Sequence, residues 1–185
     1  PLDTWRPGDA VLSNDPYSGG SHLPDMTIIS PIFDDAGVLG FAASRVHWPD
    51  IGGSAPGSSA VTDEIVKEGL RIPPVRVIRD GELDPGVSTL LFANVRVADD
   101  RMGDFRAQIA CNQRGVDRVG GLIDRYGGGA VRRILAETQD YSQRMVERAL
   151  AELPDGSYRA SQHLDGDGYI EDPGNGPLVL SVRID

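Results

Sequence analysis

Residues 25–47 read DMTIISPIFDDAGVLGFAASRVH, and this stretch decides the fold. Two apolar, β-rich runs, residues 26–33 and 38–48, are separated by the turn sequence DDAG. We therefore expect an antiparallel hairpin of two largely buried strands. In such a hairpin the chain leaves position 25 and returns beside position 47.

The remaining sequence extends this hairpin into one α+β domain with three parts. Residues 1–98 are rich in short strand sequences and in glycine-rich loops such as GGSAPGSS. Residues 99–154 have the pattern of a helical pair, two long amphipathic helices joined by glycines. Residues 155–185 return to strand patterning in DGSYRASQHL, GYI and PLVLSVRI.

The first of the two helices is expected from Asp104 to Tyr126, where apolar residues recur at helical spacing until glycines stop the run. The second run ends at Pro154. Asp104, Gln108 and Asn112 form a polar stripe on the first helix. We interpret this stripe as a solvated face, although it also suits contact with a site or a partner, and Asn112 falls within the apolar repeat.

Composition and charge restrict the class of protein. The chain has 185 residues and a formal net charge of −10, which argues against a general affinity for nucleic acid or for an anionic membrane surface. Its single cysteine, Cys111, cannot form an internal disulfide, so we expect a cytoplasmic protein. No apolar run is long enough to span a bilayer, and the first residues do not resemble a signal peptide.

His22, Asp25 and His47 are the candidate metal ligands. Pro24 makes a regular helix across His22 and Asp25 improbable, so their convergence depends on the loop itself. The predicted hairpin would bring His47 to the same end of the sheet. Two imidazoles and a carboxylate suit a divalent ion such as Zn, Mn, Fe or Co, with positions left for water and substrate. The alternative is that both histidines are hydrogen-bonded loop residues and that Asp25 forms a turn.

At this point the sequence shows a resemblance to a known family. Five motifs, in this order, resemble the hydantoinase B/oxoprolinase family: NDPYSGGSHLPDMTIISPIF, ASRVHWPDIGGSAPGS, EIVKEGLRIPPV, DGEL and GDFRAQIACNQRG. The similarity runs from about Gly8 to the end of the chain. Because members of that family are much longer, and because this sequence lacks an initiator Met and stops within an apparent strand, we expect an internal fragment.

The resemblance implies a fold, an activity and a partner. It implies a catalytic component of an ATP-dependent hydrolase of cyclic amides such as hydantoin, 5-oxoproline or a lactam, working in a hetero-oligomer with a hydantoinase A-like subunit or domain that binds ATP. This chain has no GxxxxGK[ST] motif, which agrees with ATP being bound by the partner. Two alternatives stay open: a subunit of an ATP-dependent ketone carboxylase, and a non-catalytic scaffold fragment.

The resemblance also implies a metal at His22, Asp25 and His47, most simply Zn or Mn, with a further carboxylate ligand lying upstream of Pro1. The ion's water, or bicarbonate in the carboxylase branch, would attack the activated substrate. Many relatives have a second histidine where this sequence has Trp48, which predicts a different substrate preference.

Two further acids are candidate catalytic residues. Asp15 or Asp50 would orient a ligand histidine or relay a proton, because metal-bound imidazoles usually donate their other N–H to a carboxylate or a carbonyl. Each also suits an ordinary turn, since NDP and PDI are common turn sequences.

Overall fold

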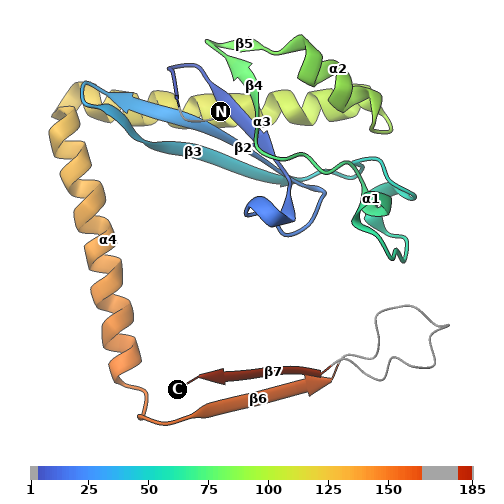
Figure 1. Cartoon of the computed structure of the whole chain (residues 1–185). Helices are drawn as coiled ribbons and strands as arrows, with labels where there is room; N and C mark the ends of the chain where they lie inside the picture. Colours follow the sequence, from blue (N-terminus) through green and yellow to red (C-terminus); the bar gives the residue numbers. More distant parts are fainter. Residues whose placement is uncertain (1–3, 164–178, 185) are drawn as a thin grey trace. The chain divides into compact units, whose positions relative to one another are not determined.

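The computed structural model describes residues 4–163 and 179–184. The chain divides into two compact units, Pro1–Ile134 and Leu135–Asp185. The predicted α+β class is confirmed, with an antiparallel sheet first, then long helices, then strands (Figure 1). The predicted strand at GYI, residues 168–170, lies outside the described residues.

The first unit is built on a five-stranded antiparallel sheet in the order β3-β2-β1-β4-β5 (Figure 1). The strands are β1 (Ala10–Ser13), β2 (Asp25–Asp34), β3 (Gly37–His47), β4 (Val75–Arg79) and β5 (Glu82–Leu83). Between them lie the short helical turns η1 (Pro16–Ser18), η2 (Pro56–Ser58) and α1 (Ile65–Glu68).

The antiparallel hairpin predicted from residues 25–47 is confirmed as β2 and β3. The expectation that both strands are largely buried is wrong, because four residues of β2 and none of β3 are buried. Asp25 pairs with His47 at the end of the hairpin away from its turn, and Thr27 pairs with Arg45 two residues further along the strands. Because side chains alternate across a strand, Asp25 and Thr27 share one face of the sheet, while Met26 between them lies on the other. The register therefore sets apart a buried face and an open face.

Helices cover the buried face. The long helix α3 (Ala98–Tyr126) packs against β2 and β3, and α2 (Pro85–Ala93) contacts α3. The core beneath them is apolar and aromatic, and its fully buried members include Leu12, Met26, Ile28, Trp48, Val77 and Phe105. This packing leaves the face that carries Asp25 free of these helices.

The boundaries of these helices differ from the sequence prediction for local reasons. Helix α3 begins at Ala98 rather than Asp104, and its N-cap residue Val97 makes no side-chain capping bond, so no capping signal marks the start. Helix α2 was missed. Its signal was present, because Asp84 accepts hydrogen bonds from the first-turn amides and Pro85 occupies the first turn.

The polar stripe of α3 faces the sheet, so the prediction of a solvated face is wrong for Gln108 and Asn112. Both are only 2% exposed. Gln108 accepts a hydrogen bond from the indole Nε1 of Trp48 (3.0 Å) and donates one to the Met26 carbonyl (2.9 Å). Asn112 donates to the Ile28 carbonyl at 2.9 Å. These amides satisfy polar groups that would otherwise be buried without partners.

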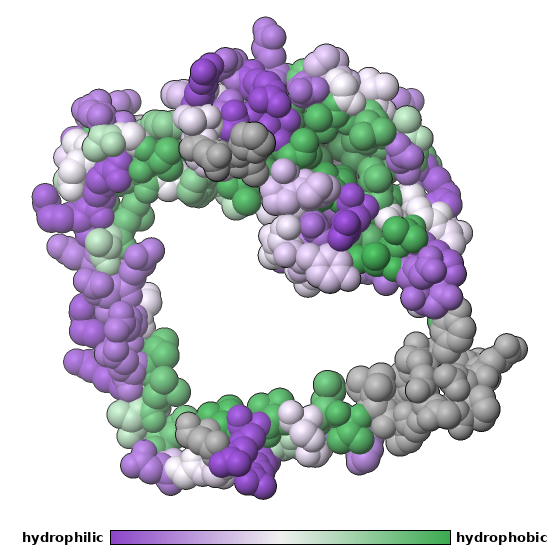
Figure 2. All heavy atoms as spheres, in the orientation of Figure 1, coloured by the Kyte–Doolittle hydropathy of each residue, from purple (hydrophilic) through white to green (hydrophobic). Residues whose placement is uncertain are grey.

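The second unit contains the C-terminal part of α4 (Gly128–Ala151) and a two-stranded antiparallel sheet of β6 (Tyr158–His163) and β7 (Val179–Ile184). Its large hydrophobic side chains are largely exposed; they include Tyr141, Met145 and Leu150 on α4 and Tyr158, Leu180, Val182 and Ile184 on the hairpin. Figure 2 shows hydrophobic residues in green along this hairpin. Among the described residues, no helix is long and apolar enough to cross a membrane.

Replacing Gln108 by Leu should lower the free energy of unfolding by about 2–4 kcal/mol, because the Trp48 indole N–H and the Met26 carbonyl would lose their partner while buried. Chemical denaturation measures this difference. Gln113→Leu on the same helix is the matched control, since exposed Gln113 bonds the exposed Asp117 and no buried group among the described residues, and it should cost about 0.5 kcal/mol or less. Equal effects of the two changes would contradict the role given to Gln108.

Candidate functional site

Asp25 and His47 form the centre of the candidate site. Their cross-strand pairing brings His47 Nδ1 to 3.0 Å from Asp25 Oδ1. The side chain of Asp25 is 24% exposed and that of His47 is 56% exposed, so both side chains are accessible to solvent. The hairpin alone accounts for this contact.

His22 joins the pair through the loop that precedes β2. Its ring centroid lies 5.4 Å from that of His47. A tight turn places it there, because the Asp25 amide donates to the His22 carbonyl at 2.9 Å, and the Trp48 amide donates to the Pro24 carbonyl at 2.8 Å. The structure thus brings together all three residues that the sequence singled out. In the described part of the chain, however, no group of three or more His, Cys, Asp or Glu side chains is arranged so that it could hold a metal ion, and this includes His22, Asp25 and His47.

Asn14 holds the loop that carries His22, and the sequence analysis missed it. Its buried side-chain amide donates to the carbonyls of Leu23 (2.7 Å) and Leu70 (2.8 Å) and accepts from the Ile72 amide (2.6 Å). Both ends of the loop are therefore tied to the segment that enters β4. The signal for this role was weak, because Asn before Asp-Pro is also a common turn sequence.

Asp15 caps the turn η1 within the same loop. Its carboxylate accepts hydrogen bonds from the Tyr17 amide (3.2 Å) and the Ser18 hydroxyl (3.1 Å), and Arg71 lies 3.9 Å away. The loop turns so tightly that a Cβ on Gly20 would lie 2.8 Å from two backbone oxygens, which excludes any larger residue there.

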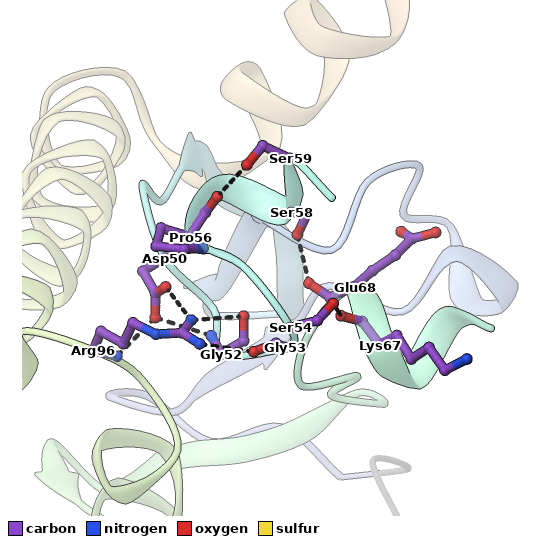
Figure 3. Close-up of polar contacts among 10 residues, drawn as sticks. All are labelled: Asp50, Gly52, Gly53, Ser54, Pro56, Ser58, Ser59, Lys67, Glu68 and Arg96. Carbon is purple, nitrogen blue, oxygen red and sulfur yellow. Dashed lines mark hydrogen bonds and ion pairs between the residues drawn. The ribbon is translucent and has the colours of Figure 1, made fainter. Parts of the chain in front are cut away.

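Asp50 lies in a separate network with Arg96 (Figure 3). Its carboxylate accepts hydrogen bonds from the Arg96 amide (2.7 Å), the Arg96 guanidinium (2.8 Å) and the Gly52 amide (3.0 Å). Burial acts to raise the pKa of Asp50, but these hydrogen bonds outweigh it and hold the pKa below its ordinary value of 3.8. In the described residues, neither histidine of the site is among the hydrogen-bond partners of Asp15 or Asp50.

The same network orders the glycine-rich loop after Asp50. Arg96 also donates to the Gly53 carbonyl at 2.8 Å, and Ser54 and Ser58 donate to the carbonyls of Lys67 and Glu68 at 2.8 and 2.6 Å (Figure 3). A Cβ on Gly53 would lie 2.6 Å from the Glu68 backbone, so glycine is required for this close approach. The glycine-rich loop, residues 52–59, is thus ordered by hydrogen bonds to Arg96 and to the backbone of residues 67 and 68.

Two hollows border the sheet. One, of about 120 Å³, lies on the open face next to the site and is lined by Val11, Ser13, Ser18, Gly19, Gly20, Thr27, Ile29, Arg45 and Pro74. The other, of about 350 Å³, is lined mainly by apolar residues such as Phe33, Ile78, Ile109 and Val116. Neither hollow is lined by His22, Asp25, His47, Asp15 or Asp50. The smaller one lies nearer the site, because Thr27 and Arg45 in its lining form the cross-strand pair next to Asp25 and His47 on the same face.

This fold is shared with solved structures. The ATP-dependent caprolactamase from Pseudomonas jessenii matches 90% of this chain with a TM-score of 0.85 and 33% identity, over 29% of its own chain. Acetone carboxylase, in a nucleotide-free structure, matches 84% of the chain with a TM-score of 0.77 over 21% of its own. At 24% identity the second match shows the fold alone.

The family follows from the sequence comparison. The model of the hydantoinase B/oxoprolinase family matches residues 2–185, and the chain belongs to this family. The caprolactamase subunit beta of Pseudomonas jessenii is 35% identical over 181 residues, which are 97% of this chain and 30% of that protein. The 5-oxoprolinase of Dictyostelium discoideum is 32% identical over 180 residues, 96% of this chain and 14% of that protein. The chain therefore spans less than a third of these relatives.

The Asp50–Arg96 network predicts a pH dependence of stability. Because the pKa of Asp50 is lowered in the folded state, its contribution is present above the unfolded value near 3.8 and is lost as the pH falls through the lower folded value. Asp50→Asn should therefore lower Tm above pH 5, and the difference from the parent should shrink below pH 3. Thermal unfolding between pH 2.5 and 7 measures it. The control Asp35→Asn, in the exposed hairpin turn, should give a curve parallel to the parent's.

Proposed function

We propose that this chain is the metal-dependent part of the catalytic component of an ATP-dependent cyclic amide hydrolase, and that it attacks a substrate activated by an ATP-binding partner subunit. The observation that carries the proposal is the convergence of His22, Asp25 and His47 at the open end of the sheet. The related caprolactamase subunit beta and 5-oxoprolinase support the reaction class, since their names describe cyclic amide hydrolases.

The donor types of Asp25 and His47 suit a divalent ion. Imidazole and carboxylate ligands lie roughly 2.0–2.2 Å from Zn²⁺, so two neighbouring ligands of one tetrahedral ion are about 3.4 Å apart. The Nδ1–Oδ1 separation of 3.0 Å between His47 and Asp25 is that of a direct hydrogen bond, and it is slightly shorter than this spacing. The His22 ring lies next to the pair and is the third donor we propose, although the three side chains as placed are not arranged as a group that could hold an ion. Three ligands of this type leave coordination positions for water and substrate, as in catalytic rather than structural sites.

Hydrolysis of a cyclic amide requires a nucleophile stronger than water and a carbonyl carbon more electrophilic than that of an ordinary amide. A bound divalent ion lowers the pKa of a coordinated water, while transfer of a phosphoryl group to the carbonyl oxygen makes the amide carbon more electrophilic. The second task falls to the ATP-binding partner. This chain's own residues hold the ligands in place: the Asn14 amide fixes the loop of His22, and the cross-strand register fixes Asp25 against His47. The backbone framework therefore orients the donors before any substrate arrives.

Asp15 and Asp50 contribute to this framework. Asp15 shapes the loop that carries His22, and Asp50 with Arg96 orders the chain that follows His47. Their predicted role as proton relays stays a prediction, and the described hydrogen bonds support loop ordering. Trp48 lies in the core at 0% exposure, so the side chain at this position points away from the open face.

Metal content tests the site directly. In the intact protein, His22→Ala and His47→Ala should each remove bound Zn or Mn, measured by elemental analysis after dialysis, because each removes a donor. His163→Ala is the matched control, since this third histidine lies exposed in β6, and it should keep the parent's metal content. Stoichiometric metal in both site variants would overturn the assignment.

The reaction class is tested with the intact protein and its ATP-binding partner. We expect ATP-dependent release of the ring-opened acid from a cyclic amide, lost in Asp25→Ala, and measured by chromatography. ATP-dependent fixation of labelled bicarbonate into a ketone would instead place the chain in the carboxylase branch. Full activity of the Asp25→Ala variant would contradict a catalytic role for this site and favour the alternative of a non-catalytic scaffold.

A further inference from the structure

We propose that Arg45 binds an oxyanion of the substrate, a carboxylate or a phosphoryl group, while the amide carbon lies at Asp25 and His47. This inference rests on the proposed function, because it assigns the substrate-binding side of the same site. It predicts that the complex acts on substrates that carry an anionic group, either from the start or after activation by the partner.

Position is the first argument. Arg45 pairs across the hairpin with Thr27, and the Asp25–His47 pair is the next one on the same face. Two residues along an antiparallel strand span roughly 7 Å, about the length of a small ring with one substituent. A substrate whose reacting carbon lies at the histidine and aspartate can therefore place an anionic group at the guanidinium.

Charge is the second argument. Within residues 4–163 and 179–184, Arg45 forms no ion pair with a carboxylate. The other two arginines near the site do have acidic neighbours, since Arg96 pairs with Asp50 at 2.8 Å and Arg71 lies 3.9 Å from Asp15. In a chain with a net charge of −10, Arg45 keeps its positive charge available for a ligand.

Orientation is the third argument. The Arg45 Nε donates to the Thr27 hydroxyl at 3.0 Å, and Nη2 donates to the Gly19 carbonyl at 3.3 Å. Both partners are neutral, so they hold the guanidinium without neutralising it. These two bonds leave the N–H groups of Nη1 free to donate to an oxyanion, and a pre-oriented guanidinium loses less conformational entropy on binding.

Space is the fourth argument. Arg45 borders the hollow of about 120 Å³ on the open face, whose other walls come from the loop of His22 and from Thr27. A water molecule takes up about 30 Å³ in the liquid, so this hollow suits a group of a few heavy atoms. That size fits a carboxylate or a phosphoryl group rather than a whole nucleotide, which agrees with ATP binding elsewhere.

The test uses the intact protein with its ATP-binding partner and two substrates with the same ring. 5-Oxoproline carries a ring carboxylate and 2-pyrrolidinone does not. Arg45→Gln should lower kcat/KM by roughly 10- to 100-fold, the range expected for a lost charge-assisted hydrogen bond. A loss confined to 5-oxoproline identifies the carboxylate as the oxyanion, and an equal loss on both substrates identifies the phosphoryl group.

Controls separate binding from folding. Arg118→Gln, an exposed arginine on α3, should leave kcat/KM unchanged. Arg45→Gln should keep the parent's metal content and Tm, and added guanidinium should partly restore the activity of Arg45→Ala, which a purely structural role would not allow. Retention of kcat/KM within threefold on both substrates would overturn the proposal.

A separate titration keeps this inference distinct from the proposed function. If the parent opens neither ring, the cyclic amide assignment fails, and binding of inorganic phosphate by calorimetry then tests Arg45 alone. A Kd at least tenfold weaker in Arg45→Gln than in the parent supports the oxyanion site. An unchanged Kd, or no phosphate binding by the parent, overturns it.

Discussion

The side-chain amide of Asn14 bonds three backbone groups in two other segments of the chain, at Leu23 and at residues 70–72, and the site depends on this contact. It donates to the carbonyls of Leu23 and Leu70 and accepts from the amide of Ile72, all while 1% exposed. A buried amide with all three bonds made is stable, whereas each lost bond would leave a buried polar group without a partner. The glycine-bent loop is thereby held at one end of the sheet, with His22 beside His47.

The opposite side of the hairpin is held by polar groups from α3. Gln108 connects the Trp48 indole to the Met26 carbonyl, and Trp48 directly follows His47 in the chain. The two strands that carry Asp25 and His47 are thus fixed by a network on the buried face, while their functional groups lie on the open face. A binding or catalytic site is expected to have accessible functional groups, here Asp25 and His47, whose backbone is fixed by buried hydrogen bonds.

Charge distribution divides the arginines of this region into two kinds. Arg96 pairs with Asp50 and orders the glycine-rich loop that contains Gly53, so its role is structural. Arg45 is held by a hydroxyl and a carbonyl and keeps its charge. The same residue type therefore has different roles because of its neighbours, a distinction that composition and spacing do not reveal. The open face combines the proposed metal ligands Asp25 and His47 with Arg45, which suits the proposed substrate, an amide that carries an anionic group.

The sequence by itself determined the hairpin, the α+β class and the placement of Asp25 against His47. It did so because strand alternation and a short turn specify the register, and the register places Asp25 opposite His47. The tertiary structure alone decided that Gln108 and Asn112 face the sheet, that Asn14 ties the loop, and that Asp50 pairs with Arg96. Each of these depends on partners 9 to 84 residues away. Local patterns describe a residue's own element, whereas a hydrogen bond between distant segments exists only after the chain has folded.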